Sequence, residues 1–167
     1  MCEPYVSQPD RGCSPQGNAK ISAGGPVNSI MKDNQQMTLG TSFAVLLIDD
    51  NAIQAATRQT ILRRAGYYVI AALNPVRALE QFQDDAFPAP ITAVITDHTM
   101  PGMSGAQFVR ELRKLQPHLP VMVISGLEEA EQEYAGLDVR FLLKPLSPDL
   151  LLSHLRFLIE QEQEGAA

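Results

Sequence analysis

Five side chains that could bind a cation or an anion follow short apolar runs of the sequence. Asp49 and Asp50 come directly after one run and Asp97 after another, while Ser125 ends a third run and Lys144 follows a fourth. Carboxylates that are crowded to about 4 Å repel each other by about 4 kcal/mol per pair at an effective dielectric constant near 20. Lys144 offers one compensating charge. A hard divalent cation, which prefers oxygen ligands, could supply the rest, so we expect magnesium (Mg²⁺) or manganese (Mn²⁺) here if the fold gathers these residues.

A carboxylate in such a cluster is a competent nucleophile toward phosphorus. Its attack gives an aspartyl phosphate, and phosphoryl transfer needs mainly positioning and neutralisation of the charge on the equatorial oxygens. Asp97 is the candidate nucleophile, because Pro101 and Gly102 turn the chain sharply after it and hold its side chain at the rim. A cation, Lys144 and the hydroxyl of Ser125 would provide the neutralising contacts.

The elements that must position these residues alternate along the chain. Continuous apolar runs, typical of strands covered on both faces, predict strands at 43–48, 67–73, 91–96, 121–125 and 139–143. Helical spacing of apolar residues, or caps such as Asn74-Pro75 and Ser104, predicts helices at 51–65, from 74, from 104, at 128–135 (short and acidic) and at 148–162. The alternation predicts an α/β fold with a five-stranded parallel sheet flanked by helices. Ligands bind such sheets at the carboxyl ends of the strands, where the polar residues lie.

The first predicted helix shows only a fair apolar stripe. Its candidates for the buried face are Ile53, Thr57, Ile61 and Ala65, which follow each other at intervals of four residues.

The domain organisation follows from composition. Residues 1–42 are rich in Pro, Gly, Ser, Asn and Gln and lack a periodic apolar pattern, so they cannot bury enough surface to offset the entropy of ordering. We expect a disordered N-terminal tail at 1–42, a folded domain at 43–162 and a disordered C-terminal end at 163–167. A later start codon, at Met31 or Met37, is the alternative explanation of the N-terminal segment.

Charge and apolar content argue against several classes of partner. The formal net charge of -6 disfavours nucleic acid or an anionic membrane surface. No apolar run approaches the roughly 20 residues that span a bilayer, and the N-terminus does not resemble a secretory signal. The two cysteines, Cys2 and Cys13, both fall in the predicted tail, which fits a reducing compartment. We therefore expect a cytoplasmic location, with no nucleic acid and no membrane as partner.

Four strings of residues carry a resemblance to a known family: LLIDD (46–50), ITDHTMPGMSG (95–105), VISG (123–126) and FLLKPLSP (141–148), in this order. Together they resemble the receiver domain of two-component response regulators, over residues 43 to about 160. The resemblance implies a flavodoxin-like (βα)5 fold with strand order 2-1-3-4-5.

The resemblance also implies a role in phosphoryl transfer for each matched residue. Asp97 would accept a phosphoryl group from the phosphohistidine of a histidine kinase or a histidine phosphotransfer protein. Asp49, Asp50 and the backbone carbonyl of Thr99 would hold the metal together with Asp97. Lys144 would bind a phosphoryl oxygen, with Thr99 also close to the group.

The switch residues are implied in the same way. Ser125 would turn inward to bond a phosphoryl oxygen, and Phe141 would change rotamer with the state of the site. The Lys144–Pro145 bond would be cis. Only 19 positions separate Ser125 from Lys144, which is short for the family, and the missing residues fall in the fourth helical segment.

The function implied is phosphorelay signalling by a single-domain response regulator that docks to an unknown downstream protein. Such a switch is not an enzyme beyond self-catalysed phosphotransfer and autodephosphorylation. A receiver that works beside a separately encoded sensor kinase, and a phosphorylation-incompetent interaction module, are the alternatives. A haloacid dehalogenase-type phosphatase would need a second Asp two residues after Asp97, where this chain has Thr99.

Overall fold

The computed structural model describes residues 44–165, and the predicted tail at 1–42 and residues 166–167 lie outside this range. The strands are β1 (Ala44–Ile48), β2 (Tyr68–Ala72), β3 (Ile91–Asp97), β4 (Val121–Ser125) and β5 (Arg140–Leu143). The α-helices are α1 (Ala52–Arg64), α2 (Pro75–Gln83), α3 (Gly105–Leu115) and α4 (Pro148–Gly165). A 3-10 helix, η1 (Glu128–Tyr134), stands between β4 and β5.

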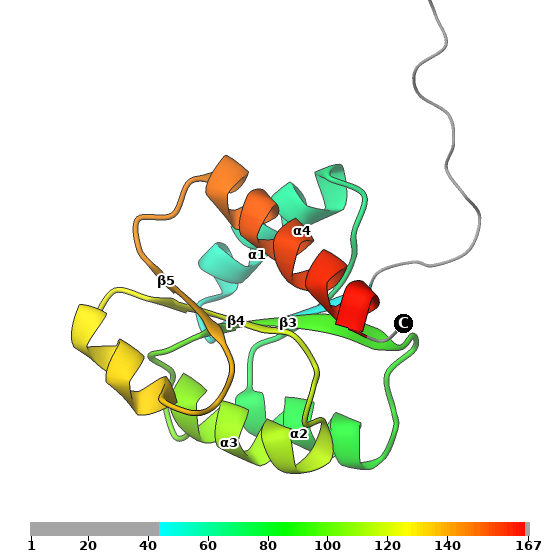
Figure 1. Cartoon of the computed structure of the whole chain (residues 1–167), viewed down its shortest axis with the longest axis vertical. Helices are drawn as coiled ribbons and strands as arrows, with labels where there is room; N and C mark the ends of the chain where they lie inside the picture. The colour runs from blue at the N-terminus through cyan, green and yellow to red at the C-terminus, as the bar shows by residue number, and fades with distance from the viewer. Residues whose placement is uncertain (1–43, 166–167) are drawn as a thin grey trace, which may run out of the picture. The chain divides into compact units, whose positions relative to one another are not determined.

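The five strands form one parallel sheet in the order β2-β1-β3-β4-β5, which confirms the predicted strand order. Figure 1 shows α1 and α4 on one face of the sheet and α2 and α3 on the other. Alternate residues of a buried strand point to opposite faces of the sheet. Leu46 belongs to the same apolar cluster as Phe108 of α3, and Leu47 belongs to the cluster of Leu155 of α4. Among the described residues, no helix is long and apolar enough to cross a membrane.

Side-chain caps fix where three helices begin, and so where the chain leaves each strand end. The side chain of Asn51 accepts hydrogen bonds at the start of α1, and Asn74, followed by Pro75, does the same for α2. Ser104 and Gln107 form a reciprocal capping box at the start of α3. Each cap satisfies backbone N–H groups that have no partner within the helix, and each agrees with the predicted helix start.

The buried stripe predicted for α1 is wrong. Ile53 is 79% exposed, Thr57 and Ala65 are also exposed, and Ile61 is only partly buried. The helix instead turns Ala55 and Leu62 inward. With them comes Arg58, whose side chain is only 14% exposed, because positions i, i+3 and i+7 share one face of a helix.

The domain boundary expected at residue 162 stays a prediction, but the last helix is longer than predicted. It was expected at 148–162, and α4 continues to Gly165. The reason lies in the sequence EQEQE (160–164), because Glu and Gln have high helix propensity and nothing breaks the helix before the glycine. The predicted short acidic helix at 128–135 is present as the 3-10 helix η1.

Candidate functional site

The polar residues predicted to share one site follow strands that are neighbours in the sheet. Asp49 follows β1, Asp97 ends β3, Ser125 ends β4 and Lys144 follows β5. The pairs β1·β3, β3·β4 and β4·β5 are all parallel, so the carboxyl ends of these strands meet at one edge. Asp49, Asp97 and Ser125 are buried there, whereas Asp50 is exposed.

Asp97 lies between the backbone that follows it and the Lys144 side chain. Its Oδ2 accepts a hydrogen bond from the backbone N–H of Thr99 at 3.1 Å. Its Oδ1 is fully buried and forms an ion pair with the Lys144 ammonium group. The charge of this carboxylate is therefore compensated by Lys144.

Lys144 is held in place by its own backbone. Its N–H donates to the carbonyl oxygen of Ser125 at 2.7 Å, and the bond to Pro145 is cis, as the family resemblance implied. The ammonium group reaches Asp97 from a backbone that is fixed against β4.

Asp49 is engaged on both carboxylate oxygens. Oδ1 accepts from the backbone N–H of Asn51 at 2.9 Å, and Oδ2 forms an ion pair with Arg58 of α1. Burial raises the pKa of Asp49 above its ordinary value, and the Asn51 N–H and the Arg58 guanidinium oppose that rise. The nearby carboxylate of Asp97 raises the pKa of Asp49 further.

Gln54 connects the two ion pairs. Its Oε1 accepts from Nη2 of Arg58 at 3.0 Å and from Nζ of Lys144 at 3.3 Å. The site therefore contains two buried carboxylates, each matched by one cation, with an amide oxygen between the cations. The sequence interpretation missed Arg58 and Gln54. The spacing of Ala55, Arg58 and Leu62 was the signal that could have indicated an inward-facing arginine.

The Ser125 hydroxyl forms hydrogen bonds with the backbone of Leu127. Its Oγ accepts from the backbone N–H of Leu127 at 2.9 Å and donates to the carbonyl oxygen of Leu127 at 3.0 Å. These two bonds close a short turn at the end of β4. Because a hydroxyl has a single proton, Ser125 would have to give up the bond that it donates to Leu127 before it could donate to a group on Asp97.

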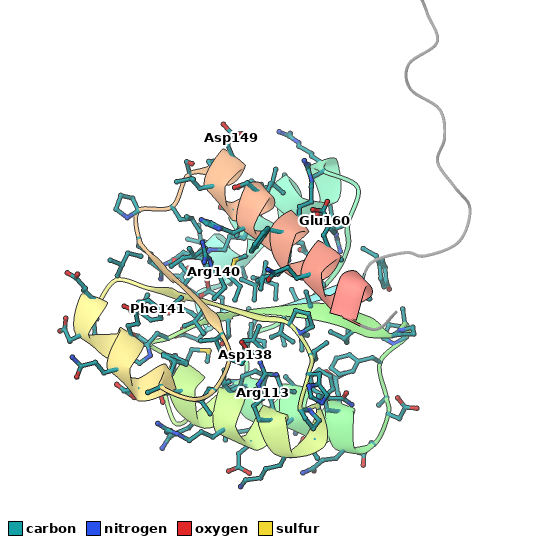
Figure 2. All side chains as sticks on the ribbon, in the orientation of Figure 1. Arg113, Asp138, Arg140, Phe141, Asp149 and Glu160 are labelled. Atoms are coloured by element: carbon teal, nitrogen blue, oxygen red, sulfur yellow. The ribbon has the colours of Figure 1, made fainter. Side chains whose placement is uncertain are left out.

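Two aromatic rings connect η1 to the site. Phe141, which Figure 2 labels on β5, is partly buried, and its ring centroid lies 5.7 Å from that of Tyr134 in η1. The Tyr134 hydroxyl lies 2.8 Å from Nδ1 of His98, the residue after Asp97. A Cβ atom on Gly105 would come within 2.5 Å of the Asp97 carbonyl oxygen and 2.7 Å of the Tyr134 hydroxyl, so this junction requires glycine.

The donor types at this edge suit a hard cation, because carboxylate and carbonyl oxygens are the ligands that Mg²⁺ prefers. Asp97 lies at this edge, and the exposed Asp50 is available as a ligand. Within residues 44–165, however, no three acidic, histidine or cysteine side chains converge into a ready metal cluster. Arg58 pairs with the predicted ligand Asp49 instead. The ligand types at this edge therefore suit Mg²⁺, and Asp49 could bind it once Arg58 has moved away.

Comparisons with known proteins agree with the fold. A family model described as the response regulator receiver domain matches residues 45–156. The chain is 30% identical over 123 residues to the hydrogenase transcriptional regulatory protein HoxA of Cupriavidus necator, covering 71% of this chain and 24% of that protein. It is 30% identical to the sensor protein EvgS of Escherichia coli, covering 74% of this chain and 10% of that protein.

A solved structure shows the same fold. The response regulator receiver protein of Sinorhizobium medicae superposes with a TM-score of 0.65 at 28% identity, covering 72% of this chain and 97% of that one. The curated relatives are longer proteins, of which this chain spans 24% and 10% in the two cases above.

Proposed function

Since the chain belongs to the response regulator receiver domain family, we propose that Asp97 accepts a phosphoryl group and thereby switches a partner-binding surface. The observation that carries the proposal is the ion pair between the buried Oδ1 of Asp97 and the Lys144 ammonium group at the common edge of the strands. It places a positive charge beside the carboxylate where phosphoryl charge would develop. The proposed domain is a phospho-acceptor switch and not a general phosphatase.

The donor is proposed to be the phosphohistidine of a histidine kinase or a histidine phosphotransfer protein. Asp97 Oδ1 forms the new bond to phosphorus while the bond from phosphorus to the imidazole nitrogen breaks, and that nitrogen keeps the electron pair. Lys144 then exchanges its contact with Asp97 for one with a phosphoryl oxygen. The backbone N–H of Thr99 holds Oδ2 and so orients Oδ1.

Mg²⁺ would neutralise charge on the phosphoryl oxygens. The proposed ligands are Asp50, Asp97, the backbone carbonyl of Thr99 and, after it leaves Arg58, Asp49. Mn²⁺ has similar ligand preferences and is a suitable substitute.

The switch is proposed to run through Ser125 and Phe141. The Ser125 hydroxyl exchanges its two bonds with Leu127 for one with a phosphoryl oxygen, which moves the turn after β4. Phe141 packs against Tyr134 of η1, so a rearranged turn changes the space beside both rings. Contacts that exist in only one state are what shifts a population between two conformations.

The downstream target is proposed to be another protein. Action without an attached output domain, and a cytoplasmic location, stay predictions.

Labelling with a small phosphodonor tests the proposal. Wild type incubated with acetyl phosphate and Mg²⁺ should gain the mass of one phosphoryl group, and Asp97→Asn should not. Asp84→Asn, the same change at the C-terminal cap of α2, is the matched control and should be labelled as wild type is. Equal labelling of Asp97→Asn would contradict the assignment. No labelling of wild type would favour the phosphorylation-incompetent interaction module.

A further inference from the structure

We propose that Arg58 competes with Mg²⁺ for Asp49, so that the metal binds fully only after the guanidinium group has moved away. The inference rests on the proposed function, because that proposal assigns the metal to this edge of the sheet. In this proposal, Arg58 lowers the affinity of the site for the metal.

The Arg58–Asp49 pair is not a solvated surface contact. The exposed fraction of the side chain is 14% for Arg58 and 2% for Asp49. Arg58 stands between Ala55 and Leu62 on the buried face of α1, where a cation without a partner would be costly. The pair therefore fixes the guanidinium at the site in the metal-free protein.

Only one oxygen of Asp49 can be released easily. Oδ1 accepts from the N–H of Asn51, whose side chain caps α1, so this contact belongs to the rigid start of the helix. Oδ2 is bound by the end of a long, flexible arginine side chain. A divalent cation beside Asp49 would also repel the guanidinium charge, so metal binding and the ion pair oppose each other.

The structure also provides a place for the guanidinium near its present position. Nη2 of Arg58 already donates to Oε1 of Gln54, and Gln54 is exposed. A change of rotamer would carry Arg58 toward this amide and solvent. Because Gln54 also accepts from Lys144, the two cations of the site share one acceptor.

The consequence is a site that is balanced in charge before the metal arrives. Arg58 offsets Asp49 and Lys144 offsets Asp97, so the buried carboxylates do not depend on Mg²⁺ for neutralisation. A receiver built in this way has a lower metal affinity, and is more stable without metal, than the same chain lacking the guanidinium.

An Mg²⁺ titration followed by NMR tests the competition. Arg58→Met keeps an unbranched apolar stem and removes the charge. We expect its dissociation constant for Mg²⁺ to fall on the order of tenfold, since a charge-assisted hydrogen bond no longer has to be broken. Arg77→Met is the matched control, because Arg77 is 79% exposed and pairs with Glu80 on α2. Its dissociation constant should stay within about twofold of the wild-type value, because surface pairs contribute little.

A measurement on the wild-type protein supports the variant. The side-chain Nε–Hε signal of Arg58 should shift during the titration with the same midpoint as the backbone amide of Thr99. If Arg58→Met does not fold, this signal decides the question. A dissociation constant for Arg58→Met equal to or above that of wild type, or an unchanged Arg58 signal at saturating Mg²⁺, would overturn the inference alone. Absence of Mg²⁺ binding in both proteins would overturn the inference together with the proposed metal site.

Discussion

The carboxylate of Asp97 and the ammonium group of Lys144 form an ion pair in which Oδ1 of Asp97 is fully buried. The two residues lie 47 positions apart in the sequence, and the adjacent ends of β3, β4 and β5 bring them together. The same ion pair therefore affects the stability of the fold and the reactivity proposed for Asp97.

Removing Lys144 should destabilise the protein through Asp97. Lys144→Met leaves a buried carboxylate uncompensated, which costs several kcal/mol in a fully buried pair. Because the Lys144 side chain is 28% exposed, we expect a loss of about 1–3 kcal/mol in the free energy of unfolding in urea after the corresponding discount for screening. Combining it with Asp97→Asn should cost less than the sum of the single changes.

Lys114→Met is the control for this cycle, because Lys114 pairs with Glu111 on the surface of α3. It should change the free energy of unfolding by less than about 0.5 kcal/mol. Strict additivity of Lys144→Met and Asp97→Asn would show that the pair contributes nothing.

Gly105→Ala should destabilise the junction between β3 and α3. The new methyl group would meet the backbone oxygen of Asp97 at 2.5 Å, and neither β3 nor α3 can shift cheaply. We expect a loss of about 1–3 kcal/mol, typical of overpacking in a filled interior, measured by chemical denaturation. Gly126→Ala, where the methyl group meets nothing within 4 Å, should lose less. An equal loss for both variants, or no loss in Gly105→Ala, would show that this close contact does not govern stability at Gly105.

Ser125→Ala should separate phosphorylation from switching. The variant keeps Asp97 and Lys144, so it should still take up a phosphoryl group, but it lacks the hydroxyl that would bond it. NMR shifts of β4, η1 and β5 induced by beryllofluoride should be much smaller than in wild type. Ser125→Thr, which keeps a hydroxyl, should restore them. Full shifts in Ser125→Ala would show that the coupling does not depend on this hydroxyl.

The pKa of His154 should lie below the ordinary pKa of a histidine. Partial burial and the neighbouring Arg140 lower the pKa of His154, whose Nδ1 lies 3.2 Å from the Arg140 guanidinium. Because the folded state favours the neutral ring, this stabilisation is present above the unfolded pKa of about 6.5 and is lost as the pH falls through the lower folded pKa. An NMR titration of the His154 ring should give a midpoint below 6.5, and Arg140→Gln should raise it. A midpoint that Arg140→Gln leaves unchanged would assign the shift to burial alone.

The sequence was sufficient to predict which residues end the strands, because parallel α/β topology turns that pattern into a common edge. It was not sufficient to predict which face of α1 is buried. The stripe through Ile53 has the stronger apolar character, yet the helix turns Arg58 inward, where the charge of Asp49 compensates it. Such pairing depends on how far a long side chain can reach from α1 to the end of β1, and periodicity does not contain that information.

The bonding state of the Ser125 hydroxyl was also beyond what the sequence pattern could predict. Ser125-Gly126 is ordinary turn chemistry, and the structure shows Ser125 bonding Leu127 in that manner. The same hydroxyl can serve the turn or a phosphoryl oxygen, so residue type alone does not distinguish the two states.

Chemical trapping of the acyl phosphate shows which aspartate carries the phosphoryl group. The phosphorylated protein is reduced with borohydride, which converts an aspartyl phosphate to homoserine, and peptide mass spectrometry then locates the change. We predict homoserine at position 97 and at no other aspartate. Homoserine at position 49 or 50 with none at 97, or its absence from a fully labelled sample, would contradict the proposal that Asp97 is the phospho-acceptor.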